Sequence, residues 1–586
     1  MRGWFLKLAS AFFAFSIGLV VFVHPPVEAS GNKHIVTYEE FLGMVNDPDN
    51  TDCYERAHDT RRSKPSGTFG GIVYDYSQLP DPRDMIFVCV NDKFLPTDVP
   101  VEIENGFTLM PMRALFEALG ATVKWNAATE TVTAVLDQSV MELTVNKRTA
   151  RVNGEEVAMD VPARTIRGRV YVPLRFVSKH LGRAVVWQPE NRIVKVFSYP
   201  ELSVTPIPVP DEHRTKDYVY TNYFRPATRF LLYQNGEIHW LLQAGDKIHV
   251  HIFDESFRKK GEAVLRAELP KFGGAHAGDD GNFYLVFGQD NMAESDDVTV
   301  YRVVKYDRRW NKIAHVDVKG VYVRKPFHAS NLTMASRNGV LVVYSARERY
   351  TSEDGLNHQS NIPVHIRMDD MTILYAGGQW PRNHVSHSFA NYVKFDGERI
   401  VYLDHGDAYP RSIYLQVEES GRIAQEVNLI SFPGKTGDNY TGATLGGLEV
   451  SNDHYLAVGT YIKPGSKTKQ LFLASVPKQA ETDEGVNLVY LTGPSDPSVT
   501  ETHIIKLNED RFVLIWSDAG SRRNVSYAVT DGRGRMVGKP KRLENIAPPG
   551  HLEPLVLNGK IIWYFYEMFP INKEIKAEFY SLKIQP

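Results

Sequence analysis

Five histidines occupy comparable places after residue 214, and they are the residues best placed to do chemistry. Each lies 5 to 11 residues ahead of a short turn sequence that an apolar run follows. If the strands around these turns meet at a common axis, their imidazoles can bind a metal, transfer protons or contact an anionic glycan. The five are His276, His328, His387, His503 and His551.

Charged residues near these histidines can complete such a site. They are Asp279, Asp404, Glu501, Arg347, Arg349 and Arg411. A plainer interpretation is that the histidines only hydrogen-bond neighbouring strands, and their uneven spacing means that they need not lie at one height. We therefore treat the five histidines as candidate ligand-binding residues and assign no catalytic residue, no metal and no cofactor.

The elements that would position these residues form a repeat. A turn followed by a nearly all-apolar strand recurs seven times, with turns at 235–236, 280–281, 338–339, 396–397, 452–453, 509–510 and 558–559. Further strands follow most turns and helical periodicity is almost absent. About four short strands per repeat, with an inner strand apolar on both faces, is typical of β-propeller blades. Residues 214–586 are predicted to be an all-β propeller with seven blades, six being the alternative.

A different repeat precedes this region, in residues 86–198. Two copies are offset by 62 residues, and each holds an Asn-containing turn, a Pro-x-Arg segment, a Leu-Gly pair and a Val-x-Trp strand. Pro111 and Pro173 stand where a helix begins, and Gly120 and Gly182 stand where it ends, a position that favours φ > 0. The predicted fold class is therefore multidomain: a small α+β tandem repeat module followed by the propeller.

These residues resemble the copper amine oxidase N-terminal domain-like module, a stalk domain found on exported bacterial proteins. The second copy, from Tyr171 to Trp187, is similar to the family motif throughout, whereas the first departs from it at Met110 and Met112. In that family the module is not catalytic and holds neither copper nor quinone. The resemblance implies a surface location and does not imply amine oxidation.

One segment is similar to the quinone-forming site of the amine oxidases themselves. Thr436–Tyr440 fits Thr-x-x-Asn-Tyr, but Thr441 replaces the acidic residue that follows in that family. Copper needs a His-x-His pair and a third histidine downstream. The only His-x-His, His249 and His251, lies upstream, so amine oxidase activity is not expected.

The first 29 residues read as a secretory signal, with cleavage predicted after Ala29. Arg2 and Lys7 precede a mostly apolar run of 13 residues, Ala11–Val23, which is shorter than the roughly 20 residues that span a bilayer. An uncleaved anchor is the alternative. We expect a bacterial protein that is secreted or attached to the cell surface or cell wall, with no stable membrane span after cleavage.

The remaining segments are predicted to be less regular. Residues 30–85 are expected to be irregular apart from a short helical stretch, and residues 199–213, with four prolines, are expected to be an extended linker. The last blade appears short of one strand, which residues 218–224 could supply to close the ring. Cys53 and Cys89, the only cysteines, form one disulfide or stay unpaired.

Composition excludes one class of function. The chain has 67 basic and 70 acidic residues, a net charge of −3, without the basic surplus of a nucleic-acid binder. The favoured function is a non-catalytic, envelope-associated protein whose propeller binds a glycan, a small ligand or a surface protein. One alternative is an extracellular polysaccharide lyase or hydrolase with its site at the propeller mouth, and another is a purely structural or assembly protein.

Overall fold

The computed structural model describes residues 84–584 apart from 92, 189–191, 208–228, 481, 520–523, 551 and 569–574, together with short pieces before residue 84. The signal-like segment and residues 218–224 lie outside the described residues. Residues 30–85, predicted to be irregular, contain a small sheet of order β1-β3-β2. Its strands are β1 (Lys33–Ile35), β2 (Thr68–Phe69) and β3 (Ile72–Asp75).

The N-terminal module repeats its elements at the offset seen in the sequence. The first set is β4 (Phe87–Val90), β5 (Lys93–Phe94), β6 (Glu102–Glu104), β7 (Phe107–Pro111), α3 (Met112–Ala118), β8 (Thr122–Asn126) and β9 (Thr131–Leu136), followed by β10 (Ser139–Thr144). The second set is β11 (Thr149–Val152), β12 (Glu155–Ala158), β13 (Arg164–Ile166), β14 (Arg169–Pro173), α4 (Leu174–His180), β15 (Ala184–Gln188) and β16 (Ile193–Phe197). Each helix starts directly after its proline.

Glycine ends both helices in the same way. Gly120 has φ +80° and Gly182 φ +66°, the left-handed conformation that costs glycine least. The amide of the next residue reaches back to the last helical turn, Ala121 to the Phe116 carbonyl at 2.8 Å and Arg183 to that of Ser178 at 2.7 Å. Both helices thus end in the motif that satisfies orphan carbonyls and lets the chain turn into a strand.

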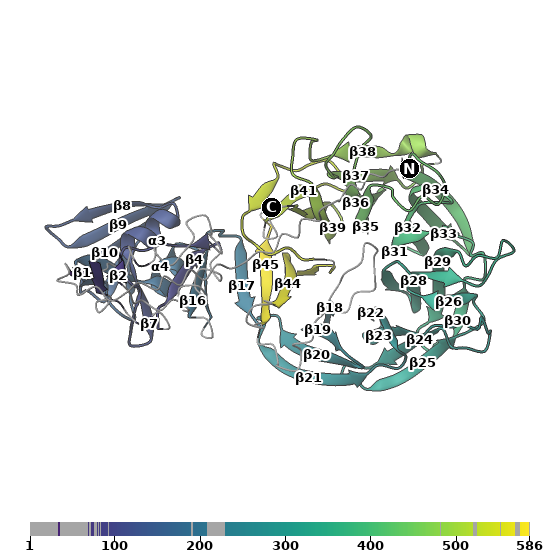
Figure 1. Ribbon diagram of the computed structural model, residues 1–586, viewed down its shortest axis with the longest axis horizontal. Coiled ribbons are helices and arrows are strands. Elements are labelled where there is room, and N and C mark those ends of the chain that lie inside the picture. Colours follow the sequence, from purple (N-terminus) through teal and green to yellow (C-terminus); the bar gives the residue numbers. More distant parts are fainter. Residues whose placement is uncertain are drawn as a thin grey trace, which may run out of the picture.

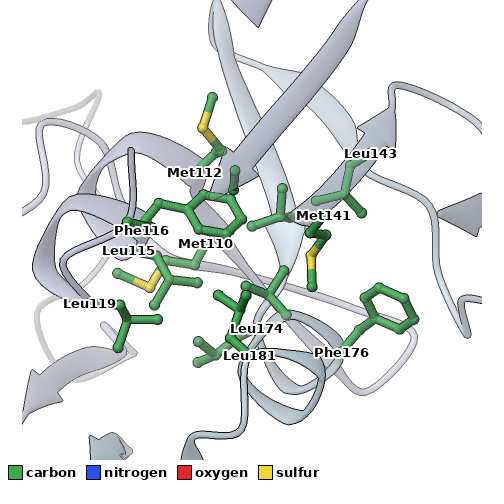
Figure 2. Packing of buried hydrophobic residues seen from close by; sticks show 14 of the residues in the cluster. Met110, Met112, Leu115, Phe116, Leu119, Met141, Leu143, Leu174, Phe176 and Leu181 are labelled. Atoms are coloured by element: carbon green, nitrogen blue, oxygen red, sulfur yellow. The ribbon is translucent and has the colours of Figure 1, made fainter. Parts of the chain in front are cut away.

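The two sets interlock and share one core. β7 pairs with β14, and β16 pairs in parallel with β4, so each set completes a sheet of the other. Figure 2 shows Leu115, Phe116 and Leu174 packed together between the helices and sheets. Because the sheets are mixed in this way, neither set could bury its apolar residues alone.

The second set also packs against the rest of the protein. Val186 and Phe197 lie in one buried cluster with Ile505 and Trp563 from the C-terminal region. The equivalent positions of the first set, Lys124 and Val135, are exposed. Only the second set is covered at these positions, which explains why Val186 stands where the first set has the exposed Lys124.

Residues 202–206 and 229–583 form seven antiparallel sheets that follow one another around a ring (Figure 1). Ring sheets 1 and 2 are β18 (Arg229–Gln234), β19 (Glu237–Ala244), β20 (Lys247–Asp254), β21 (Lys259–Arg266), then β22 (Lys271–Ala277), β23 (Phe283–Gly288), β24 (Tyr301–Tyr306), β25 (Lys312–Val318). Ring sheet 3 has an extra strand: β26 (Val323–Pro326), β27 (Leu332–Arg337), β28 (Val340–Arg349), β29 (Gln359–Arg367) and β30 (Ile373–Ala376).

The other ring sheets follow the same plan. Ring sheets 4 and 5 are β31 (Ser388–Asp396), β32 (Arg399–Gly406), β33 (Ser412–Glu419), β34 (Arg422–Ser431), then β35 (Ala443–Val450), β36 (His454–Tyr461), β37 (Gln470–Pro477), β38 (Asn487–Tyr490), with a short helix η2 (Asp483–Gly485). Ring sheets 6 and 7 are β39 (Val499–Asn508), β40 (Arg511–Asp518), β41 (Val525–Thr530), β42 (Lys541–Leu543), then β43 (Leu555–Leu557), β44 (Lys560–Met568) and β45 (Ile575–Lys583), which β17 (Leu202–Pro206) joins.

The apolar strand after each turn is the second strand of its sheet, whereas the sequence interpretation made it the innermost. The strand before the turn is the one nearest the ring centre, as β18, β22 and β31 show in Figure 1. All six residues of β23 are buried. Second strands are apolar on both faces because a neighbouring sheet packs against each face.

The last ring sheet is completed from the other end of the ring. β17 pairs antiparallel with β45, Val204 opposite Tyr580. The segment expected to be an extended linker thus contains the strand that completes the last ring sheet. Beside it, Lys195 Nζ lies 3.6 Å from Glu578 Oε1, both side chains being buried, and Gln188 donates to the same oxygen at 3.1 Å. Module and ring are therefore joined by a strand, a core and a buried ion pair.

Within the part of the chain that the structure describes, no helix has both the length and the apolar composition needed to cross a bilayer.

Candidate functional site

Two of the five candidate histidines lie on one face of the ring. His328 and His387 come just before the innermost strands of ring sheets 3 and 4, β27 and β31. Gln359 links them, because its side-chain amide donates to the His328 carbonyl at 3.0 Å and its own carbonyl accepts the His387 amide at 2.9 Å. We call the face on which these strands begin the entry face.

His387 rests on a buried carboxylate. Its Nδ1 lies 2.9 Å from Oδ1 of Asp407, which is fully buried and whose carboxylate oxygens accept no hydrogen bond from any other described residue. The contact favours a proton on Nδ1 and leaves Nε2 available as an acceptor. His387 also has φ +54°, a conformation that costs a non-glycine residue on the order of 1 kcal/mol.

A second histidine faces the first. The rings of His358 and His387 are 6.5 Å apart, centre to centre, and His358 Nε2 lies 2.7 Å from Asp354 Oδ2. The sequence interpretation missed His358 because it lies between the second and third strands, away from the turns that marked the repeat. Two imidazoles, each beside a carboxylate, are an arrangement able to exchange protons with a bound ligand.

Trp380 lies on the segment between β30 and β31 that leads to His387. This residue is 65% exposed, and its ring packs against His384 at 4.8 Å and over the Arg349 guanidinium at 4.1 Å. The Arg349 amide in turn donates to the His358 carbonyl at 2.8 Å. The sequence had marked Arg349 but neither aromatic neighbour.

Two tyrosines border the other side of His387. Tyr409 is 68% exposed and its carbonyl accepts the Ser386 amide at 3.0 Å, while Tyr440 is 71% exposed. Arg411 holds their loops together, donating to the Asp407 carbonyl at 2.9 Å and to the Tyr440 carbonyl at 3.0 Å. Arg411, a candidate charged group in the sequence, therefore braces the backbone around His387.

A buried polar network supports His387 from below. Asp404 accepts hydrogen bonds from the Tyr344 hydroxyl and, at 2.7 Å, from Ser388 Oγ. The Asn361 amide donates to Tyr344 Oη at 2.8 Å. Burial raises the pKa of Asp404 to about 7. These side chains come from ring sheets 3 and 4, so the network fixes one sheet against the other beneath the entry face.

His276 and His503 lie elsewhere, along the innermost strands. The Lys394 ammonium lowers the pKa of Glu553, and His276 and His503 act on Glu553 in the same direction. Lys394 bridges Glu553 at 2.8 Å and Glu449 at 3.3 Å.

Both of these histidines are satisfied by neighbouring sheets. His276 Nε2 contacts Ser336 Oγ at 3.0 Å, and His503 Nε2 donates to the Gly550 carbonyl at 2.8 Å. Burial lowers the pKa of His276 to about 4. The plainer interpretation, hydrogen bonding between neighbouring strands, describes these two histidines. His551 lies outside the described residues.

No group of three or more His, Cys, Asp or Glu side chains with metal-binding geometry occurs among the described residues. Cys89, buried in β4, is disulfide-bonded, and Cys53 lies outside the described part of the chain.

Comparisons with known proteins bear on the two regions differently. Residues 89–196 match the copper amine oxidase N-terminal domain in a single stretch. No curated protein sequence matches the chain.

Solved structures with similar folds share little sequence with this chain. Polysaccharide lyase Uly1 is 10% identical, with 64% of this chain and 95% of that chain covered and a TM-score of 0.36. The β-propeller domain of the Trilobed protease from Pyrococcus furiosus is 9% identical, with 63% and 97% covered and a TM-score of 0.35. A prolyl endopeptidase is 13% identical at a TM-score of 0.31, and the match takes 57% of this chain but only 45% of that one. Residues 89–196 are therefore similar to the copper amine oxidase N-terminal domain, and the resemblance of the chain to these solved structures is too slight to bear on function.

Proposed function

We propose that this chain is an exported, envelope-associated binding protein whose ring is a seven-bladed β-propeller that holds a glycan on its entry face. The tandem module, of a kind found in extracellular proteins, would attach or position the propeller. The signal-like N-terminus of the sequence and the single disulfide-bonded Cys89 fit an oxidising, extracellular setting.

Exposed aromatic side chains carry this proposal. Trp380, Tyr409 and Tyr440 are each about two thirds exposed. Each is connected to the His358–His387 pair through neighbouring residues, Trp380 through Arg349, Tyr409 through Ser386 and Tyr440 through Arg411 and Asp407. Large apolar rings left in water around polar groups are typical of ligand-binding surfaces. A sugar fits such a surface, since its C–H face can stack on an aromatic ring while its hydroxyls bond to imidazole and carboxylate groups.

Replacing Trp380 by Ala is expected to weaken glycan binding at least about tenfold, because it removes the largest exposed ring of the entry face. The measurement is binding of the full chain to an array of envelope, plant and algal polysaccharides, followed by titration of each hit. Trp125→Ala is the matched control: Trp125 is 43% exposed but lies on β8 of the module. Equal binding by the Trp380 variant and the wild type would contradict the proposed surface, and no binding to any polysaccharide would favour the structural or assembly role.

The His387–Asp407 contact favours one second candidate, a polysaccharide lyase. A lyase removes the proton beside a uronate carboxyl group, and an imidazole held by a carboxylate is a suitable base. If the chain is a lyase, His387→Ala should reduce the release of unsaturated products from polyuronates by at least about 100-fold. His276→Ala, in the ring interior, should leave the rate unchanged. Binding without any ultraviolet-absorbing product would leave the non-catalytic function standing.

A further inference from the structure

Two arginines beneath the entry face lack acidic partners. Arg347 and Arg349, two residues apart on β28, are 0% and 2% exposed. Neither makes an ion pair with a carboxylate among the described residues. Arg347 donates to the carbonyls of Val321 and Gly378, and Arg349 donates to that of Gln379 at 3.3 Å. The Nε of each arginine is buried and finds no acceptor in the described part of the chain.

Carbonyls supply partial negative charge but do not neutralise a guanidinium, so positive charge remains buried at Arg347 and Arg349. Burial lowers the pKa of Arg347 only to about 10, which leaves it charged at neutral pH. His384 is neutral at neutral pH and cannot offset the arginines, because burial, helped by both arginines, lowers its pKa to about 4. Its buried Nδ1 has no partner among the described residues.

The acids of the entry face are already engaged. Asp354 contacts His358 at 2.7 Å, and Asp407 contacts His387 at 2.9 Å. Glu348 pairs with Arg324 and Lys325, and Glu418 pairs with Arg382 at 2.9 Å. Burial lowers the pKa of Arg349 and Asp354 opposes that shift, but none of these neighbouring carboxylates forms an ion pair with Arg347 or Arg349.

The Trp380 side chain packs directly over Arg349. The exposed Trp380 ring lies 4.1 Å over the Arg349 guanidinium, and the preceding residues Gly378 and Gln379 supply the carbonyls that bind both arginines. A sugar ring that stacks beside or displaces the indole would bring its substituents to Arg349. A carboxylate or sulfate would there gain charge-assisted hydrogen bonds that a neutral sugar cannot form.

We propose that the glycan recognised by the entry face is anionic, a polyuronate or a sulfated polysaccharide, and that Arg349 beneath Trp380 is the residue that selects its charge. This inference rests on the glycan-binding function proposed above and names the class of its ligand.

The test compares paired polysaccharides that differ only in charge. The full chain is titrated with polygalacturonate and its methyl ester, and with dextran sulfate and dextran. The wild type should bind the anionic member of at least one pair about tenfold more tightly, and this preference should shrink as salt is added. Comparison of the affinities for polygalacturonate and dextran sulfate shows whether the preferred anionic group is a carboxylate or a sulfate.

Arg349→Gln should abolish the preference, so that the anionic and the neutral member of each pair bind with similar affinity. The melting temperature of this variant should equal or exceed that of the wild type, because the substitution removes a buried charge that has no carboxylate partner. If Arg349 had only a structural role, its loss would lower the melting temperature. The control is Arg367→Gln, at the far end of β29, where Arg367 pairs with Asp370 at 3.1 Å, and its preference should be unchanged.

The outcomes separate the two proposals. In one outcome, charged and neutral polysaccharides bind equally well and Trp380→Ala weakens the binding of both. That result would overturn the anionic assignment and leave the glycan-binding function in place. A preference that survives in a folded Arg349→Gln variant would overturn the role of Arg349. Absence of binding to every polysaccharide would overturn both proposals.

Discussion

Replacing Val204 by Asp is expected to unfold the ring at temperatures at which the wild type is folded. Val204 lies in β17, opposite Tyr580 of β45, and is buried in the cluster that joins the module to the last ring sheet. An unpaired charge there would destabilise the fold by at least about 4 kcal/mol. β17 is the outer neighbour of β45 in the last ring sheet, so its detachment would also expose the edge of β45.

The matched control lies one residue away. Ser203 is on the same strand but is exposed, so Ser203→Asp should change the stability by no more than about 1 kcal/mol. Calorimetric melting of the two variants beside the wild type is the measurement. A Val204 variant as stable as the Ser203 variant would show that the ring holds together without the closing strand.

The Asp404→Asn variant is expected to lose the pH dependence that this buried carboxyl gives the protein. The folded-state pKa of about 7 lies above the unfolded value, so between pH ~4 and ~7 the folded state binds the extra proton and stability falls as pH rises. The asparagine cannot ionise. Relative to the wild type it should therefore gain on the order of 4 kcal/mol between pH 4 and pH 8.

Hydrogen bonding in the network allows this substitution. Tyr344 already accepts from the Asn361 amide, so its hydroxyl proton goes to position 404, while the Ser388 hydroxyl can rotate to accept from a new amide. Urea unfolding at pH 5 and pH 8 measures the effect, with Asp369→Asn, at an exposed turn, as the control. A stability difference between the Asp404 variant and the wild type that is the same at both pH values would refute the assignment.

The sequence predicted the sheets of the ring better than their closure. Turns such as Asn235-Gly236 and strands such as β23 are local signals, because a strand buried on both faces must be apolar throughout. β17 gives a weak signal: Leu202 and Val204 alternate with polar residues, but Pro200 and Pro206 flank them and suggested an extended linker. An outermost strand tolerates proline at its end, so only the pairing with β45 reveals it.

The candidate site was predicted in part for a similar reason. His328 and His387 were found because they precede the innermost strands, and position along a repeat can be read from sequence. His358, Trp380 and Asp407 lie in or beside other strands and join the site only through the packing of ring sheets 3 and 4. The same reasoning placed His276 and His503 at the site, but they lie within the ring, where neighbouring sheets satisfy them.

The pairing of β17 with β45 has a consequence for how the protein is made. The strand that emerges from the ribosome first among those of the ring pairs with the one that emerges last. Until β45 has been synthesised, β17 has no partner and the ring stays open, with the buried Glu578 not yet present to meet Lys195. A chain terminated before β45 would therefore display open strand edges and a lysine without its carboxylate, whereas a chain that includes β45 would bury both.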